Sequence, residues 1–316
     1  MLPQRTVAVA GANGMVGRHL VEALLARGAR VIALVRSPGS HPFPPNVDVR
    51  RWQARDSVAP IDGADAVVNL VGDPIFARAW TARRKEELAY TRRMATRSLV
   101  EGLRNAGGEG RTFVSSSAIE YSGDTGDALV DETAAPGRGF LAELASTWET
   151  EALRVVGTGA RLVVVRQSLV LGREGGTFAA LLPFYRRGLG GTLGRGDQWM
   201  SWIHVDDAAR LIAHAIDDPR IGGPLISASP YPVTNRSFSR SFGRALHRPR
   251  LGGVPAPVLR LALGERADLF LDSHRALPRL ALATGFHFRF PDLDEALGDL
   301  VGHRLGAAER PARATT

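Results

Sequence analysis

The chain of 316 residues is 44% hydrophobic and 23% charged, which is typical of a folded globular protein. It has no cysteine, so disulfides, thiolate metal sites and cysteine nucleophiles are excluded. The net charge is +8, but the basic residues are scattered, and Lys85 is the only lysine among 40 of them. We interpret this as a dispersed basic surface and expect no nucleic-acid partner.

The beginning of the chain leads directly into an apolar strand pattern, without the charged segment and cleavage site of a signal peptide. No apolar run reaches the roughly 18–20 residues that span a bilayer. We therefore expect a soluble, cytoplasmic protein without a membrane partner. The histidines show no paired spacing, and no G-x-S-x-G motif occurs, so we expect neither a metal site nor a hydrolase nucleophile.

Short apolar runs alternate with helical patterns over the first two-thirds of the chain. The predicted strands cover residues 6–11, 30–35, 47–52, 65–72, 111–117 and 161–166, and the predicted helices cover about 18–27, 80–105 and 138–156. Strands that are apolar throughout are typical of a sheet covered by helices on both faces. The pattern predicts an α/β fold with a Rossmann-type, doubly wound parallel sheet.

The pattern changes after residue 170, where glycine-rich segments and short helices follow. One more strand is expected at 224–229, and helices are expected to begin at Thr234, Ser273 and Asp292. We predict an NADP(H)-binding domain at 1–170, completed by about 203–230, and a smaller, mostly helical substrate lobe at 171–202 and 231–305. Residues 306–316 have the composition of a disordered tail.

Three glycines follow the first predicted strand. Gly11, Gly14 and Gly17 lie between that strand and the first predicted helix, in a G-x-x-G-x-x-G spacing. Such a turn lets backbone amides approach a pyrophosphate, and the helix N-terminus adds unpaired N–H groups and a positive dipole end. Strand, glycine loop and helix in this order predict a dinucleotide site rather than a merely structural turn.

The end of the second predicted strand indicates which dinucleotide binds. NAD sites usually place an acidic residue there to hold the ribose 2′-hydroxyl, but no acidic residue occurs between Glu22 and Asp48. Arg36 and Ser37 follow the strand instead, and an arginine can pair with a 2′-phosphate. We therefore expect NADP(H) as the cofactor, with a merely exposed arginine as the alternative.

Several longer segments resemble one subgroup of atypical extended short-chain dehydrogenases/reductases. They are residues 69–88, 115–123, 140–149, 188–207 and 232–249, and the resemblance extends over about residues 5–302. Members of this subgroup are described as epimerase-like or, in some bacteria, as cell-division-inhibitor-like. The resemblance implies a Rossmann-type domain, a small C-terminal lobe and NADP(H) in the cleft.

The resemblance also implies roles for single residues. It matches Gly11, Asn13, Gly14, Met15, Val16 and Gly17 to the phosphate loop, Arg36 and Ser37 to the 2′-phosphate site, Leu70, Val71 and Gly72 to the segment under the adenosine ribose, and Ser115 and Ser116 to the strand end beside the nicotinamide. Trp52 either flanks the adenine or packs in the core. Ser117 aligns with the serine that binds the substrate oxygen in active relatives, and Tyr121 with a tyrosine of the substrate pocket.

The acid and base of the superfamily are missing from this sequence. Active members use Tyr-x-x-x-Lys, in which the lysine lowers the tyrosine pKa. Counting back from Glu149, which aligns with the glutamate that usually follows the motif, gives Leu141 and Ala145, and a shift by one gives Phe140 and Leu144. The subgroup pattern lacks the two residues as well.

Other side chains must therefore carry the chemistry. We expect Ser117 and Tyr121 to be catalytic, with Tyr121 or a water as proton source, although Tyr121 also fits a role as pocket wall. Glu120 is interpreted as a solvated surface carboxylate, and His204 and Asp206 as a structural hinge in which Asp206 caps the next helix. Substrate contacts are expected from Arg166, Gln198, Trp199 and Trp202.

Two functions remain open at this point. The first is an NADP(H)-dependent oxidoreductase or epimerase-like enzyme for a small carbonyl or hydroxyl substrate, since losing a general acid slows a reaction by typically 10²–10⁴-fold without removing hydride transfer. The second is a non-catalytic NADP(H)-binding sensor or regulator linked to cell division. We also expect a homodimer through the helices at 80–105 and 138–156, with Leu144, Trp148 and Leu153 pointing outward.

Overall fold

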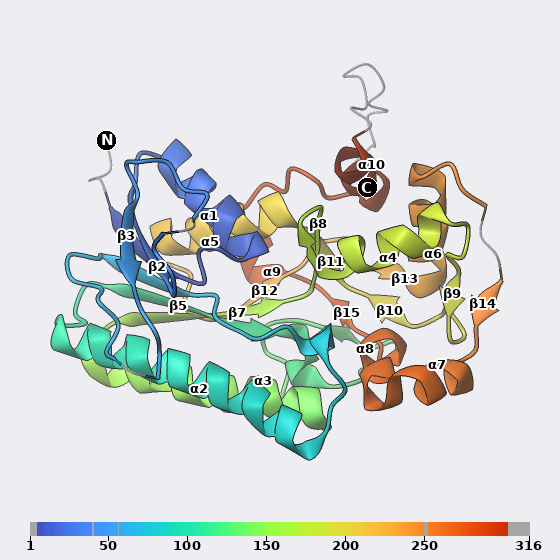
Figure 1. Cartoon of the computed structure of the whole chain (residues 1–316), viewed down its shortest axis with the longest axis horizontal. Coiled ribbons are helices and arrows are strands. Elements are labelled where there is room, and N and C mark those ends of the chain that lie inside the picture. The colour runs from blue at the N-terminus through green and yellow to red at the C-terminus, as the bar shows by residue number, and fades with distance from the viewer. Residues whose placement is uncertain (1–4, 40, 56, 250–251, 303–316) are drawn as a thin grey trace.

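A computed structural model describes residues 5–39, 41–55, 57–249 and 252–302. At its centre is a parallel sheet of seven strands in the order β12-β7-β5-β4-β1-β2-β3 (Figure 1). The strands are β1 Thr6–Ala10, β2 Arg30–Val35, β3 Asp48–Arg51, β4 Ala66–Asn69, β5 Thr112–Ala118, β7 Arg161–Gln167 and β12 Gly223–Ser227. Each corresponds to a predicted strand, and the expected doubly wound α/β fold is confirmed.

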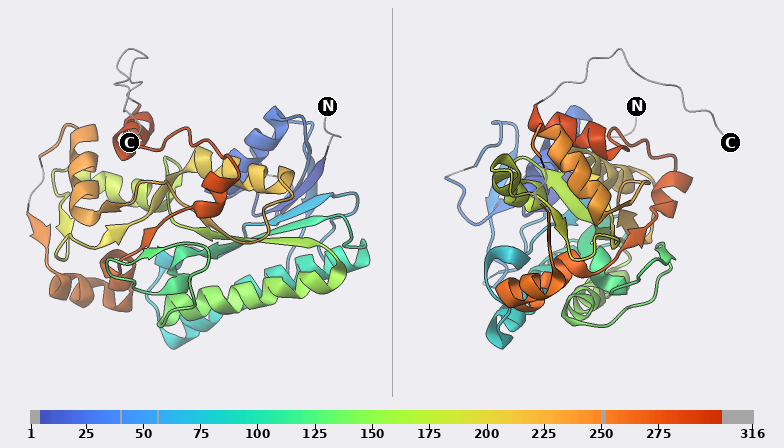
Figure 2. Two further views of the ribbon diagram at one scale, coloured as in Figure 1. Left: turned by 180° about the vertical axis from the view of Figure 1, so that it is seen from behind. Right: turned by 90° about the vertical axis from the view of Figure 1, so that its right-hand side faces the viewer.

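Helices cover both faces of this sheet. On one face lie α2 Ala82–Asn105 and α3 Phe140–Leu153, side by side, and on the other lie α1 Met15–Ala26 and α5 Val205–Asp217 (Figure 1). The predicted helices at 18–27, 80–105 and 138–156 correspond to α1, α2 and α3. Figure 2 shows the same layers from behind, with the C-terminal region beyond one end of the sheet.

Side chains along each central strand alternate between the two helix layers on either face of the sheet. In β1, Val7 and Val9 pack into the core with α1 and α5, whereas Ala8 and Ala10 pack into the core that includes Leu99 of α2. These four side chains are at most 1% exposed. Successive side chains of a strand point to opposite faces, so a central strand covered on both sides must be apolar throughout.

The C-terminal part of the chain builds a separate hydrophobic core. It contains Leu171, Phe178, Tyr185, Trp202, Phe238, Phe242, Leu293, Ala296, Leu297 and Leu300. These residues come from β8 Leu169–Gly172, α4 Gly176–Arg186, β11 Trp202–His204, α6 Asn235–Ala245 and α10 Leu293–Val301. This second core supports the proposed substrate lobe. The expected tail at 306–316 lies outside the described residues.

The remaining elements are short. The strands are β6 Leu129–Val130, β9 Thr192–Leu193, β10 Trp199–Met200, β13 Val233–Thr234, β14 Gly253–Val254 and β15 Arg275–Ala276. The helices are α7 Ala256–Leu263, α8 Asp268–Leu271 and α9 Arg279–Ala283, with 3₁₀ turns at Ile75–Ala77, Ile119–Ser122, Arg154–Thr158 and Gly264–Ala267. Within the part of the chain that the structure describes, no helix is long and apolar enough to cross a membrane.

Two of the predicted helix caps are confirmed and two are wrong. Thr234 and Asp292 cap α6 and α10 by accepting N–H groups of the first turn. Ser273 precedes β15 instead of a helix, and its hydroxyl donates to the Gly126 carbonyl at 2.6 Å. Asp206 was expected to cap α5, but the cap is His204, whose Nδ1 accepts the N–H of Asp206 at 3.1 Å.

Candidate functional site

The turn between β1 and α1 depends on its glycines. Gly11 has a positive φ of 82°, and its carbonyl accepts the N–H of Gly14 at 3.0 Å. A Cβ at Gly17 would lie 2.2 Å from the Gly11 oxygen, so no larger residue fits there. Gly14 is the N-cap residue of α1 and has no side chain that could cap it, which leaves the first N–H groups of the helix to an anionic ligand.

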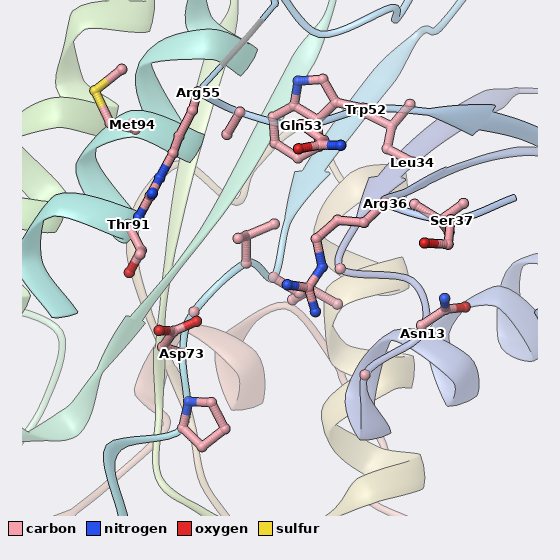
Figure 3. A pocket seen from close by; sticks show the side chains of 18 residues that line it. Asn13, Leu34, Arg36, Ser37, Trp52, Gln53, Arg55, Asp73, Thr91 and Met94 are labelled. Atoms are coloured by element: carbon pink, nitrogen blue, oxygen red, sulfur yellow. The ribbon is translucent and has the colours of Figure 1, made fainter. Parts of the chain in front are cut away.

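A first cavity of ≈ 850 Å³ opens at this turn, along the carboxyl ends of β1, β2 and β4 (Figure 3). The predicted cofactor residues in its wall are Gly11, Asn13, Gly14, Arg36, Ser37, Trp52, Leu70, Val71 and Gly72. Ligands of doubly wound sheets bind at the carboxyl ends of the strands, where the strand order reverses. The first cavity has this position, since β1 pairs with both β2 and β4.

Arg36 and Ser37 follow β2 and are exposed at the first cavity. Figure 3 shows the Arg36 side chain reaching into the cavity, between the glycine loop that carries Asn13 and the indole of Trp52. A guanidinium presents N–H groups in a planar fork that matches two phosphate oxygens. This end of the cavity therefore suits a 2′-phosphate.

Trp52 packs in the core, as one of its two expected roles requires, and it also lines the first cavity. Its side chain is 4% exposed, and its Nε1 donates to Ser98 Oγ on α2 at 3.1 Å. The same side chain lines the first cavity next to Leu34 and Gln53. Trp52 is thus a core residue with one edge at the cavity wall, where a flat heterocycle can pack.

One wall of the first cavity was missed by sequence reasoning. It consists of Gln53, Ala54, Arg55, Asp73, Pro74, Thr91 and Met94. Thr91 and Met94 lie three positions apart on α2, a spacing that puts side chains on one helix face. That spacing was the available signal, but only the packing of α2 against the sheet shows that this face reaches the cavity.

Gly72 lies directly on a buried arginine. A Cβ at Gly72 would be 3.0 Å from Arg92 Nη2, which donates to the Asp73 carbonyl at 3.1 Å. Burial lowers the pKa of Arg92 to about 10, so the guanidinium still carries its charge at neutral pH. The cavity floor at 70–73 therefore has a fixed positive charge beneath it.

Other predicted cofactor residues lie deeper. Met15 contacts the loop after β8, since a Cβ at Gly172 would lie 2.5 Å from the Met15 Sδ. Val16 packs against the core, and Ser115 and Ser116 are 1% and 9% exposed at the end of β5. Their contacts with a cofactor remain a proposal.

Ser117 belongs to a buried polar network. Its hydroxyl donates to Glu149 Oε1 at 2.6 Å, and Arg166 donates to both oxygens of Glu149 at 2.9 and 3.0 Å. The Arg166 guanidinium lies 3.7 Å from the centroid of the Tyr121 ring. Glu149 on α3, for which the sequence indicated no role of its own, therefore connects Ser117 to Arg166 and Tyr121.

The four predicted substrate residues have partners within the protein. Arg166 is 5% exposed and occupied by Glu149, which does not fit the expectation that it reaches an acidic substrate. Gln198 donates to the carbonyls of Leu193 and Phe270 at 2.9 and 2.8 Å. Trp202 is fully buried in the C-terminal core, and Trp199 donates to Asp127 at 2.9 Å. Gln198, Trp199 and Trp202 fix the C-terminal region. None of the four lines the first cavity, and none lines the second cavity described below.

Apolar side chains fill the place of the missing acid and base at the start of α3. Leu144 and Ala145 are 6% and 2% exposed. Phe140 packs edge-on against Trp80, with ring centroids 5.1 Å apart. Leu141 is partly buried and faces a second cavity. The Ala145 side chain is therefore almost inaccessible to water.

The prediction that Leu144, Trp148 and Leu153 of α3 point outward is wrong for the first two. Trp148 is 7% exposed and donates from Nε1 to Thr96 on α2 at 3.0 Å, and Leu144 is 6% exposed. Both side chains are buried between helices of the same chain. Leu153 is 56% exposed, as expected.

The second cavity, of ≈ 270 Å³, lies at the N-terminal end of α3. Its wall consists of Trp80, Lys85, Glu120, Gly123, Arg138, Gly139, Phe140, Leu141, Ala142, Glu265, Asp268, Asp272 and His274. These residues come from α2, the turn after β5, α3 and the C-terminal region. The position matched to the missing tyrosine, Leu141, therefore borders an acidic cavity.

Glu120 is partly buried in this wall, so the expectation of a solvated surface carboxylate is wrong. After β5 the chain enters the 3₁₀ turn Ile119–Ser122, which packs against α3. This turn directs Glu120 toward the C-terminal region. Burial, and to a lesser extent the negative charge of Asp272, raises the pKa of the Glu120 carboxyl to about 7.

Comparison with known proteins agrees with this geometry. The NAD dependent epimerase/dehydratase family matches residues 7–226. The chain belongs to this family. A domain of unknown function, DUF1731, matches residues 254–300, which include α7, α8 and the segment with Asp272 and His274.

Relatives of this family match almost the whole chain. The epimerase family protein Mb2239 of Mycobacterium bovis is 38% identical over 297 residues, which is 92% of this chain and 96% of that protein. Human epimerase family protein SDR39U1, crystallised with NADPH, superimposes with a TM-score of 0.84 at 32% identity and covers 93% of this chain and 98% of that one. The expected resemblance to epimerase-like extended short-chain dehydrogenases/reductases is confirmed.

More distant members share the fold alone. The UDP-glucose 4-epimerase of Thermotoga maritima, solved with UDP-glucose, superimposes with a TM-score of 0.77 at 18% identity and covers 94% of this chain and 98% of that one. At this identity the match carries no argument about substrate.

Proposed function

We propose that this epimerase-family protein is an NADP(H)-dependent oxidoreductase or epimerase-like enzyme that acts on a small carbonyl or hydroxyl substrate. The observation that carries the proposal is the first cavity, where Arg36 and Ser37 face the uncapped N-terminus of α1. Both features favour phosphate groups. The human relative that was crystallised with NADPH supports the same cofactor.

The first cavity fits this cofactor in size and charge. Its ≈ 850 Å³ is within the roughly 300–1,000 Å³ of ligand sites. The glycine loop from Gly11 to Gly17 would hold the pyrophosphate, Arg36 the 2′-phosphate, and Leu70–Gly72 the adenosine ribose. When bound, NADPH supplies a hydride.

We infer that the network around Glu149 orients the substrate oxygen. Ser117 donates its proton to Glu149, so its oxygen can still accept a hydrogen bond. Ser117 is 3% exposed, and neither Ser117 nor Tyr121 lines the first or the second cavity, so a substrate oxygen must enter beyond the cavity walls to reach it. Arg166 holds Glu149 and packs on Tyr121. A catalytic role for Ser117 and Tyr121 remains part of this proposal.

A second candidate function is an NADP(H)-binding sensor or regulator, with cell division as its proposed context. One observation favours it: Leu144 and Ala145 are buried and apolar where active relatives need a charged lysine. Such a protein would bind the cofactor and turn nothing over.

Two measurements distinguish the candidates. Calorimetry compares NADPH with NADH, and a screen of small aldehydes, ketones and alcohols follows the NADPH absorbance. The enzyme hypothesis expects tighter binding of NADPH and turnover of at least one compound. Binding without turnover favours the sensor, and equal affinity for both cofactors contradicts the NADP(H) assignment.

We also propose a homodimer. Leu153 and Val156, 56% and 58% exposed at the end of α3, offer it an apolar surface in place of Leu144 and Trp148. Light scattering at tens of micromolar protein should give the mass of a dimer. A monomeric mass would contradict the proposal.

A further inference from the structure

The second cavity joins parts of the chain that lie far apart in sequence. Figure 1 shows α7 and α8 beside the ends of α2 and α3. Lys85 of α2 forms an ion pair with Glu265, and Arg266 donates to the Phe76 carbonyl at 3.4 Å. The cavity is therefore closed by the C-terminal region, at the end of α3 where Leu141 replaces the tyrosine.

Acidic groups dominate this cavity. Its carboxyls belong to Glu120, Glu265, Asp268 and Asp272, and its cationic side chains are Lys85 and Arg138. Lys85 is neutralised by Glu265. Among the described residues, neither Glu120 nor Asp272 forms an ion pair, although Arg138 lines the same cavity and the charge of Arg260 lowers the pKa of Asp272 slightly.

Protonation relieves this crowding of negative charge. Burial raises the pKa of Asp272 to about 6, with Asp268 and Asp124 adding to the effect, and it raises the pKa of Glu120 to about 7. His274 stays neutral, because burial lowers its pKa to about 4. A carboxyl that gains and loses its proton near the working pH is suited to general acid–base catalysis.

Hydrogen bonds hold the C-terminal wall of the cavity in place. The backbone N–H of Ser273 donates to Asp124 at 3.0 Å, and the N–H of Thr125 donates to the Ser273 carbonyl at 3.0 Å. The N–H of His274 donates to the Trp199 carbonyl at 2.9 Å. Asp272 and His274 flank Ser273 and are therefore fixed in position.

His274 gives an independent indication of a ligand. Its Nδ1 is buried and has no hydrogen-bond partner among the described residues, while the side chain lines the cavity. A buried polar atom without a partner costs roughly 1–3 kcal/mol. Because the side chain lines the cavity, a small rotation of the ring would present this nitrogen to a ligand group.

We propose that the second cavity is the substrate site and that Glu120 is the group that exchanges a proton with the substrate oxygen. This assignment rests on the function proposed above. NADPH, when bound, would supply the hydride for the carbonyl carbon and become NADP⁺, and Glu120 would give its proton to the carbonyl oxygen, so that the alcohol is formed. Glu120 is left as a carboxylate and regains its proton from water.

The same cavity indicates the substrate class. Its ≈ 270 Å³ is below the roughly 300–1,000 Å³ of sites for drug-sized ligands, so the substrate is small. The carboxyls of this wall outnumber its cationic side chains, Lys85 and Arg138, which disfavours phosphates and carboxylates. A neutral or cationic carbonyl compound that offers hydrogen-bond donors matches this wall.

The protonation of Glu120 is tested without substrate, by ¹³C NMR of the full chain carrying ¹³C at the glutamate carboxyls. We expect one resonance that titrates at about pH 7, is absent in Glu120→Gln and shifts to lower pH in Asp272→Asn. The matched control is Glu143→Gln, because Glu143 is an exposed residue of the first turn of α3 that does not line the cavity. Titration of every glutamate near its ordinary pKa of 4.5 would overturn the assignment.

Kinetics with the compounds from the NADPH screen test the proton transfer. Glu120→Gln should lower kcat by roughly 10²-fold or more and abolish the ionisation near neutrality in the pH profile, with NADPH affinity unchanged. Asp272→Asn should move that ionisation to lower pH. Turnover by Glu120→Gln at the parent rate overturns the role of Glu120 and leaves the proposed function intact. A parent protein that binds NADPH and reduces nothing overturns both.

Discussion

The two cavities of this protein are assembled in different ways. The first is lined mostly by short segments that directly follow β1, β2 and β4, so each segment carries its own sequence signal. The second takes its wall from positions 80–85, 120–123, 138–142 and 265–274. A binding motif can be found by reading along the chain only when the fold keeps its residues close in sequence. The following predictions test this difference between the cavities.

The largest effect is expected where the missing acid and base are restored. Leu141→Tyr with Ala145→Lys places an ammonium group at a position that is 2% exposed. An unpaired buried charge destabilises a protein by about 3–5 kcal/mol. Denaturant unfolding should show this loss, with no gain in turnover. Leu141→Tyr alone is the control. A double variant that is as stable as the parent and has a higher turnover would show that α3 still accommodates the tyrosine and the lysine.

The next effect concerns the first cavity. Arg36→Ala should weaken the binding of NADPH by about 1.5–3 kcal/mol, because a charge-assisted hydrogen bond is lost. NADH, which has no 2′-phosphate, should bind almost as before. Calorimetry with both cofactors measures the difference. Arg55→Ala, on the opposite side of the cavity (Figure 3), is the comparison and should not discriminate between them.

The acidic second cavity should make stability depend on pH. The Glu120 pKa rises on folding from about 4.5 to about 7. The contribution of this group to the free energy of unfolding is therefore full below pH 4.5, the unfolded pKa, and is lost as the pH rises through the folded pKa of about 7. Glu120→Gln has no carboxyl that loses a proton, so its free energy of unfolding relative to the parent should increase by about 1–3 kcal/mol between pH 5 and 8. Thermal unfolding across this range checks it. The stability of Glu143→Gln should depend on pH as that of the parent does. If the stability of Glu120→Gln shows the same pH dependence as the parent, the burial of the carboxyl is contradicted.

The smallest effect is expected for the network behind the second cavity. Ser117→Ala and Tyr121→Phe should each lower turnover by at least about tenfold, or 1.4 kcal/mol, with NADPH affinity nearly unchanged. Tyr121→Phe keeps the ring on which Arg166 packs, so it removes only the hydroxyl. Steady-state kinetics and calorimetry provide the two readouts. Unchanged turnover in both variants would remove Ser117 and Tyr121 from the proposed mechanism.

The sequence by itself determined the sheet and the cofactor side of the molecule. Val7–Ala10 can only be a central strand covered on both faces, because an apolar run of this kind has no solvent side. Gly11 and Gly17 predicted the phosphate loop because each is required by local geometry, a positive φ in one case and a close backbone approach in the other. Arg36 was identified by its place at a strand end.

Only the tertiary structure decided what surrounds the substrate side. Glu120 looks like any surface carboxylate until the turn after β5 brings it against Asp272, which is distant in sequence. Leu144 and Trp148 were predicted to point outward into a dimer interface, but both are buried, and Trp148 donates to Thr96 on α2. Arg166 had an unknown partner until α3 supplied Glu149. A pKa and an ion pair depend on burial and on charges within a few ångströms, and sequence spacing does not encode those distances.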